Sequence, residues 1–220
     1  MNILVFMGSA RSSTPPRPAR LGERVTQAII NCLHCYNDIQ VTLVDPLDYP
    51  LEPVFKPHFA YAQSQVPDKL DALAAQIRAA DGYVMVSPEY NHSMSPALCH
   101  LLNHFGSSLF SFKPSAIATY SAGQWGGARA AVGMRTFLGE LGCLPVSAMI
   151  HVPHAQSLLS EDGGFNDSEQ QEHWQGYFSR TLNQLLWWAG AARAQQIVQP
   201  SDAISKAFTR SPAQRNAPGA

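Results

Sequence analysis

Short apolar runs alternate along this chain with longer segments whose apolar residues recur every three or four positions. Five runs are typical of buried strands, at residues 2–7, 39–44, 83–87, 116–120 and 146–152. Five other segments have the spacing of amphipathic helices, at residues 20–36, 67–80, 96–106, 128–141 and 167–189. Strands that alternate with helices favour an α/β fold, in which helices cover both faces of a parallel sheet.

Right-handed crossovers leave few topologies for five such strands. We predict a flavodoxin-like three-layer sandwich with a five-stranded parallel sheet in the order 2-1-3-4-5. The predicted domain spans residues 1–192. Residues 193–220 are rich in Ala, Gln, Ser and Pro, and we expect them to form a mobile tail or to pack on a partner.

Charge and cysteine content narrow the function classes. Fifteen basic and sixteen acidic residues leave a formal net charge of −1, which argues against a nucleic-acid partner. No run approaches the roughly 20 apolar residues of a membrane helix, and no basic segment precedes the first apolar run. Four scattered cysteines suggest free thiols and a cytoplasmic location. The charged fraction of 14% is compatible with surface hidden in a homo-oligomer.

Three of the predicted strands end in unusual loops, at residues 8–14, 87–93 and 121–129. Ligands of open α/β sheets bind beyond the carboxyl ends of the strands, so these loops are expected to converge on one crevice. The first loop combines hydroxyl groups with Arg11 just before a helix, which suits a phosphate group. An ordinary polar loop explains the same composition, and ordinary turns explain the other two loops.

These loops resemble those of the NADPH-dependent FMN reductase family of flavodoxin-like proteins, which includes quinone, azo-dye and chromate reductases. The matching segments are Gly8-Ser9-Ala10-Arg11, Ser87-Pro88-Glu89-Tyr90-Asn91-His92-Ser93 and Ser121-Ala122-Gly123-Gln124-Trp125-Gly126-Gly127-Ala128-Arg129. The resemblance implies that FMN is the cofactor and NADPH or NADH the co-substrate. It also implies a homodimer or homotetramer and a small-molecule electron acceptor.

The resemblance assigns cofactor contacts to three groups of residues. By this resemblance, the phosphate is held by Ser9, Arg11, Arg20, Leu21 and Gly22. The flavin ring is lined by Pro88, Glu89, Tyr90 and Asn91, and its other side is closed by Ser121, Gly123 and Gly126. Many members carry a Ser-x-Asn pair after the first Arg. Here residues 13–18 read Ser-Thr-Pro-Pro-Arg-Pro, which leaves open the side chains that complete the phosphate cradle.

The leading hypothesis is therefore an FMN-dependent NAD(P)H oxidoreductase, with a flavin-binding electron carrier or regulatory module as the alternative. A third reading, a phosphate-binding hydrolase, lacks an evident nucleophile. We assign no catalytic acid, base or metal ligand, because the cofactor carries hydride transfer. For Glu89 and His92 a structural role is favoured.

Three further features have a simple reading. Cys32 and Cys35 are read as ordinary thiols, and His151 with His154 gives a weak metal signal. The aromatic loop at residues 46–66 favours an interface over a free lid.

Overall fold

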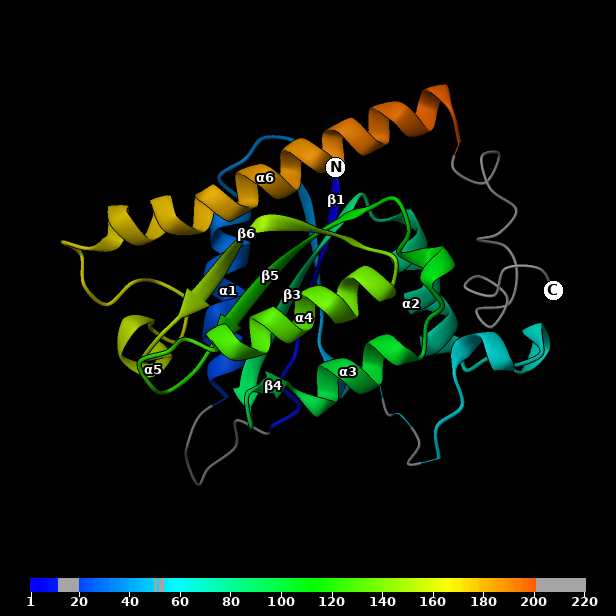
Figure 1. Cartoon of the computed structure of the whole chain (residues 1–220), viewed down its shortest axis with the longest axis horizontal. Coiled ribbons are helices and arrows are strands. Elements are labelled where there is room, and N and C mark those ends of the chain that lie inside the picture. Colours follow the sequence, from blue (N-terminus) through cyan, green and yellow to red (C-terminus); the bar gives the residue numbers. More distant parts are fainter. Residues whose placement is uncertain (12–19, 50, 52–53, 201–220) are drawn as a thin grey trace.

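The computed structural model describes residues 1–11, 20–49, 51 and 54–200. Its sheet contains five parallel strands in the spatial order β2-β1-β3-β5-β6. Their bounds are β1 (Asn2–Met7), β2 (Gln40–Val44), β3 (Gly82–Tyr90), β5 (Pro114–Tyr120) and β6 (Leu144–Val152). The two-residue strand β4 (Ser93–Met94) pairs antiparallel with the end of β3. The predicted strand order is confirmed, with β4 as an addition to it (Figure 1).

Helices cover both faces of the sheet and enclose two separate cores. Helices α1 (Leu21–Leu33) and α6 (Gln171–Val198) pack on one face, where the strands present side chains such as Ile3 and Val5. Helices α2 (Asp68–Ala79), α3 (Pro96–Asn103) and α4 (Ala128–Glu140) pack on the other face, against Leu4 and Phe6. This alternation along β1 follows from the two-residue period of a strand.

Shorter helices occupy the connections. The four-residue helix α5 (Ala155–Leu158) follows β6, in a segment where the sequence predicted a polar loop. Single 3₁₀ turns are η1 (Pro46–Asp48), η2 (His58–Ala60), η3 (Gln63–Gln65) and η4 (Ser107–Leu109). Within the described ranges, the protein contains no helix of the length and apolar character that crossing a bilayer requires.

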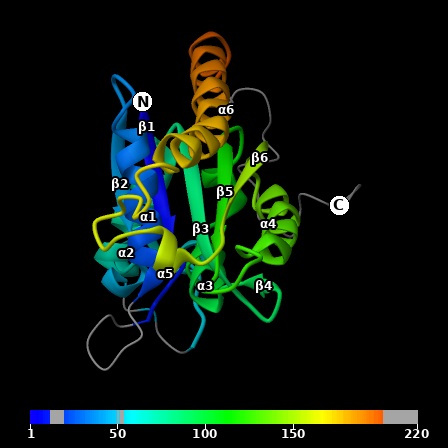
Figure 2. The ribbon, with the colours of Figure 1, turned by 90° about the vertical axis from the view of Figure 1, so that its left-hand side faces the viewer.

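Two elements extend past their predicted C-terminal ends. Strand β3 was expected to end at residue 87, but it continues through Pro88, which pairs with Tyr120 of β5. Helix α6 was expected to end near residue 189, but it runs to Val198, and Arg193 lies 3.7 Å from Asp81 in an ion pair. Figure 2 shows this end of α6 projecting beyond the sheet. Predictions for residues 12–19, and for the tail beyond residue 200, lie outside the described residues.

Candidate functional site

The first and second loops are tied together at the carboxyl edge of the sheet. The backbone N–H of Gly8 donates to the carbonyl of Val86 at 2.7 Å. The hydroxyl of Ser95 donates to the carbonyl of Gly8, and the backbone N–H of Ser95 donates to the hydroxyl of Ser87 at 2.9 Å. Because β1 and β3 are neighbours, these bonds fix both loops at one point of the edge.

The third loop is held against the end of β6. The N–H of Ser121 donates to the carbonyl of Val152 at 3.1 Å, and the N–H of His154 donates to the carbonyl of Gly123 at 3.0 Å. Gly126 has a φ of +58°, and a Cβ there would lie 3.0 Å from the backbone nitrogen of Val152. Glycine at 126 is therefore required by protein packing, whereas a Cβ on Gly123 would meet no atom within 4 Å.

Two histidines, His151 near the end of β6 and His154 just after it, support this loop separately. His151 Nδ1 lies 2.9 Å from the hydroxyl of Thr119, which donates to the carbonyl of Gly126 at 2.9 Å. His154 Nδ1 lies 3.2 Å from the carbonyl of Ala122. Each ring therefore positions a different part of the third loop. Among the described residues, no group of three or more His, Cys, Asp or Glu side chains is placed to hold a metal ion.

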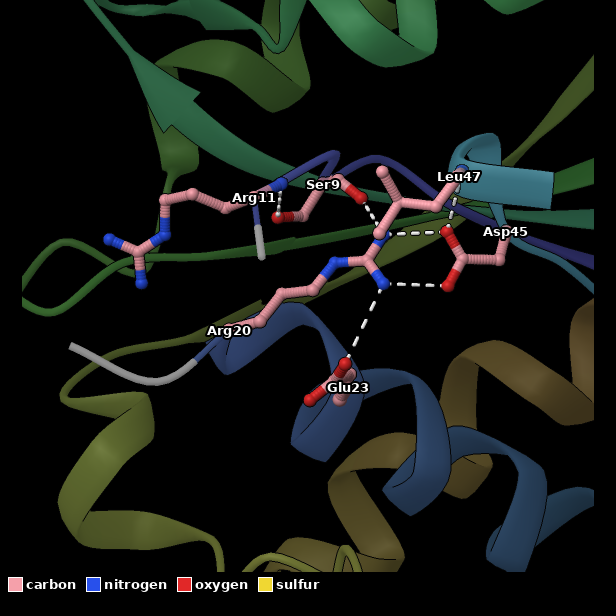
Figure 3. A network of polar contacts seen from close by, with 6 residues as sticks. All are labelled: Ser9, Arg11, Arg20, Glu23, Asp45 and Leu47. Atoms are coloured by element: carbon pink, nitrogen blue, oxygen red, sulfur yellow. Dashed lines mark hydrogen bonds and ion pairs between the residues drawn. The ribbon is translucent and has the colours of Figure 1, made fainter. Parts of the chain in front are cut away.

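Arg20 is buried in a network that fixes the first loop (Figure 3). Its side chain is 2% exposed, and its guanidinium makes two contacts of 2.6 Å with the carboxylate of Asp45. It also donates to the backbone carbonyl of Ser9, and Glu23 lies 3.6 Å away. Burial acts to lower the pKa of Arg20, but Asp45 and then Glu23 outweigh it and raise that pKa. Because Asp45 neutralises its charge, Arg20 acts here as a positioning residue for the first loop.

Arg11 differs from Arg20 in its surroundings. It is exposed, and Figure 3 shows its side chain pointing away from the pair of Arg20 and Asp45. Ser9 beside it is 4% exposed, and the N–H of Arg11 lies 3.4 Å from the Ser9 hydroxyl. Of the two arginines that the resemblance assigns to a phosphate, Arg11 is the one directed to the surface.

The start of α1 is closely packed on Tyr120. A Cβ on Gly22 would lie 2.7 Å from the Tyr120 hydroxyl and 3.0 Å from Cβ of Ser9. Burial raises the pKa of Tyr120 well above its ordinary value, and a hydrogen bond with Ser9 opposes that rise in part. Tyr120 therefore joins the end of β5 to the first loop. Gly22 is needed for this contact within the protein.

Three helices follow β1, β3 and β5, and their N-termini differ. The hydroxyl of Ser95 caps α3 by accepting from the N–H of Leu98 at 3.1 Å. The carboxylate of Glu89 caps α4 by accepting from the N–H groups of Arg129 and Ala130 at 3.1 and 3.3 Å. At α1 the N-cap residue, Arg20, makes no side-chain hydrogen bond to the helix N-terminus. A helix N-terminus attracts anions, so α1 is the helix suited to a phosphate.

The second loop turns by a hairpin that sequence reasoning did not predict. Asn91 and His92 have φ values of 51° and 61°, and Tyr90 pairs with Ser93 across them. Positive φ at both central residues is the pattern of a type I′ turn, in which Asn is favoured. Pro88 is buried below the turn. Tyr90 is 46% exposed above it.

Three further residues proved important to the site. Ser95 carries a readable signal, since Ser followed by Pro is typical of a helix start. Asp45 and Thr119 carry none, because their partners lie 25 and 32 residues away in the chain. The residues that hold the loops in shape therefore include Asp45 and Thr119, which no local sequence pattern marked.

Known proteins share this sequence in part. An NAD(P)H-dependent FMN reductase from Pseudomonas aeruginosa is 33% identical over 110 residues, covering 48% of this chain and 60% of that protein. A quinone reductase from Escherichia coli (strain K12) is 41% identical over 75 residues, covering 33% of this chain and 40% of that protein. Both matches cover less than two thirds of the relative's own length.

Solved structures share the fold. The flavoenzyme FerB, an NAD(P)H:acceptor oxidoreductase from Paracoccus denitrificans, superposes with a TM-score of 0.64 at 20% identity. The superposition covers 84% of this chain and 96% of that one. The family model described as NADPH-dependent FMN reductase matches residues 1–157, which include all three loops. The chain therefore belongs to the NADPH-dependent FMN reductase family.

Proposed function

We propose that this protein binds FMN at the carboxyl edge of its sheet and transfers hydride from NADPH or NADH to a quinone-like or other small acceptor. The observation that carries the proposal is the meeting of three family-matched loops beside the N-terminus of α1. Relatives whose names include FMN reductase, azoreductase and quinone reductase support the same chemistry.

The residues at the first loop fit a phosphate. Arg11 supplies an exposed guanidinium, and the first turn of α1 supplies N–H groups at Leu21 and Gly22. Ser9 supports this arrangement through its side-chain hydrogen bond with Tyr120. Arg20 contributes by holding the Ser9 carbonyl in place rather than by facing the phosphate.

The second and third loops fit the two sides of a flat ring. Tyr90 and Asn91 stand exposed on one side, and Gly123 borders open space on the other. Pro88 and Gly126 are buried and give these loops a rigid base. When bound there, FMN supplies the capacity to accept and release hydride. The protein's part is to orient the ring and to leave one face open to substrates.

Glu89 has a supporting role in this proposal. Its carboxylate is 12% exposed, accepts from two N–H groups of α4, and lies 3.8 Å from the guanidinium of Arg129. A carboxylate held this way stabilises the third loop and is not placed to transfer protons. Arg129 itself is 46% exposed, with its guanidinium 5.4 Å from the centre of the Trp125 ring. It is our candidate for contact with the 2′-phosphate of NADPH, because its side chain is exposed whereas that of Arg20 is buried.

The visible spectrum of the purified protein tests the proposal. We expect a flavin spectrum, present on purification or gained by adding FMN, which NADPH bleaches in the absence of oxygen. A protein that gains no bound flavin contradicts the proposal. A flavin that NADPH leaves oxidised favours the alternative of an electron carrier or regulatory module. Use of one open face in turn predicts parallel initial-rate lines with a quinone acceptor.

We further propose a homodimer or homotetramer in the cytoplasm, with no nucleic-acid or membrane partner. Apolar side chains that are largely exposed support the oligomer, among them Trp187 at 65% and Ile197 at 80% on α6. The free thiols among the described residues support the location. Light scattering coupled to gel filtration tests the oligomer, and a monomer at micromolar concentration would count against it.

A further inference from the structure

A cavity outside the three loops opens between the start of α2 and the end of α3. It measures about 280 Å³ and is lined by Tyr49, Val54, Lys56, Tyr61, Leu70 and His104 among others. No residue that the family resemblance assigns to FMN lines it. Helix α3 begins at the FMN site and ends at this cavity, and its eight residues span about 12 Å. The cavity and the FMN site are therefore separate places on the protein.

Ring contacts hold the wall on the side of α3. Phe55 packs on His100 and His104, with ring centres 5.9 and 4.9 Å apart. His104 stacks on His100 at 5.1 Å, and the N–H of His58 donates to the carbonyl of His104 at 2.8 Å. These contacts fasten the segment around residue 55 to α3, so the cavity has a built wall rather than a loose one.

His104 is a buried polar group whose ring nitrogens lack a hydrogen-bond partner among the described residues. The residue is 4% exposed. Burial and the neighbouring His100 lower its pKa, so the neutral ring is favoured. The backbone of Lys56 lies near enough to the ring to oppose that shift in part, but not in the geometry of a hydrogen bond. Buried polar groups are nearly always paired, and an unpaired one costs about 1–3 kcal/mol. Because His104 lines the cavity, a polar group of a bound ligand is the partner that we expect for it.

The other linings define the class of ligand. Tyr49, Tyr61 and Leu70 give a largely aromatic and apolar surface. Among the described residues that line the cavity, the charged groups are the ammonium groups of Lys56 and Lys69 and the carboxylate of Asp68. Lys69 is already bonded to the carbonyl of Asp48 at 2.8 Å, whereas Lys56 lies over the Tyr61 ring, 4.1 Å from its centre. Lys56 is thus the cation at the cavity for which only a ring contact is found among the described residues.

We propose that this cavity, the α2–α3 cavity, binds a small single-ring aromatic carboxylate, with its ring against Tyr49, Tyr61 and Leu70 and its carboxylate toward Lys56. The volume is near the lower end for ligand pockets, which suits one ring and is too small for a nucleotide or a flavin. The ammonium group of Lys56 favours an anionic substituent on that ring. The proposal is independent of the proposed FMN chemistry, since it rests on other residues.

Calorimetric titration of the FMN-saturated full-length protein with 4-hydroxybenzoate tests the proposal at low ionic strength. We expect saturable binding at one site per chain. The matched neutral probe, 4-hydroxybenzyl alcohol, should bind about tenfold more weakly, because it lacks the charge that Lys56 recognises. Lys56→Met should weaken binding of the acid by about the same factor and leave binding of the alcohol nearly unchanged.

Two more variants test the histidine. His104→Leu should weaken both probes, while His34→Gln, on an exposed histidine far along the chain, should bind both as the wild type does. If His104→Leu fails to fold by circular dichroism, Lys56→Met on its exposed side chain decides the matter alone. The absence of saturable binding, unchanged binding in folded Lys56→Met, or binding that FMN abolishes would each overturn the proposal.

Discussion

The buried pair of Arg20 and Asp45 provides the sharpest test of how the first loop is held. In Asp45→Asn the guanidinium of Arg20, 2% exposed, keeps its charge and loses the partner that neutralises it. Breaking a buried pair on one side costs about 3–5 kcal/mol. Asp45 is 19% exposed, which lets water replace part of the interaction and places the expected loss near the lower value, at about 3 kcal/mol.

Thermal unfolding of the FMN-free protein measures this loss. For a chain of this size, about 3 kcal/mol corresponds to a fall in Tm of roughly 6–12 °C. Glu23→Gln is the matched control, because Glu23 lies 3.6 Å from the same guanidinium but is 48% exposed. Exposed ion pairs contribute about 0–1 kcal/mol, so the control should unfold within about 4 °C of the wild type.

The same variant separates two roles for Arg20. If Arg20 positions the Ser9 carbonyl, Asp45→Asn loosens the first loop and weakens FMN binding along with stability. If Arg20 instead served as a phosphate ligand restrained by Asp45, the variant would free its charge and strengthen FMN binding. An unchanged Tm together with tighter FMN binding would refute our account of this network.

Four other variants test three separate parts of the structure. Gly22→Ala should lower the free energy of unfolding by about 1–3 kcal/mol, because its Cβ meets the Tyr120 hydroxyl. Gly133→Ala has open space on α4 and should raise that free energy by up to about 1 kcal/mol. Urea unfolding compares the two variants, and equal effects would contradict the packing at Gly22. Glu89→Gln should lower stability by about 1 kcal/mol through loss of charge at the α4 N-terminus, and a neutral effect in urea would contradict the capping role. Burial raises the pKa of Cys32 to about 11, so near pH 8 this cysteine holds little thiolate and should react with a disulfide reagent only on unfolding. Cys35 is exposed, so Cys35→Ser should remove one fast-reacting thiol per chain. An unchanged fast phase in Cys35→Ser would contradict this assignment of the two thiols.

The main elements of the fold were accessible from the sequence because each has a local cause. Apolar periodicity marked the helices, and Ser95 before Pro96 gave the start of α3 directly. Strand β3 was underestimated because Pro88 was taken as the start of a loop. Its backbone pairs instead with Tyr120, and the strand ends at Tyr90, three residues later than predicted. Helix α6 was underestimated because composition after residue 193 was read as a tail, although Ala and Gln also favour helix.

The candidate site was accessible in outline for a different reason. The glycines and the Pro-Glu-Tyr-Asn segment are local signals, and the structure brings their loops to one edge. The partner of Arg20 was not accessible, because Asp45 is 25 residues away and no local pattern links them. Whether an arginine faces a ligand or a carboxylate depends on such long-range contacts, which a single sequence does not contain.

The central claim is that this edge of the sheet binds FMN and passes hydride from a nicotinamide through it. Anaerobic titration of the FMN-loaded protein with NADPH, followed by the visible flavin absorption, tests that claim most directly. The account predicts one FMN per chain and full bleaching by one equivalent of NADPH, with colour restored by an added quinone. A protein that binds no FMN, or whose bound flavin stays oxidised with excess NADPH and NADH, would contradict it.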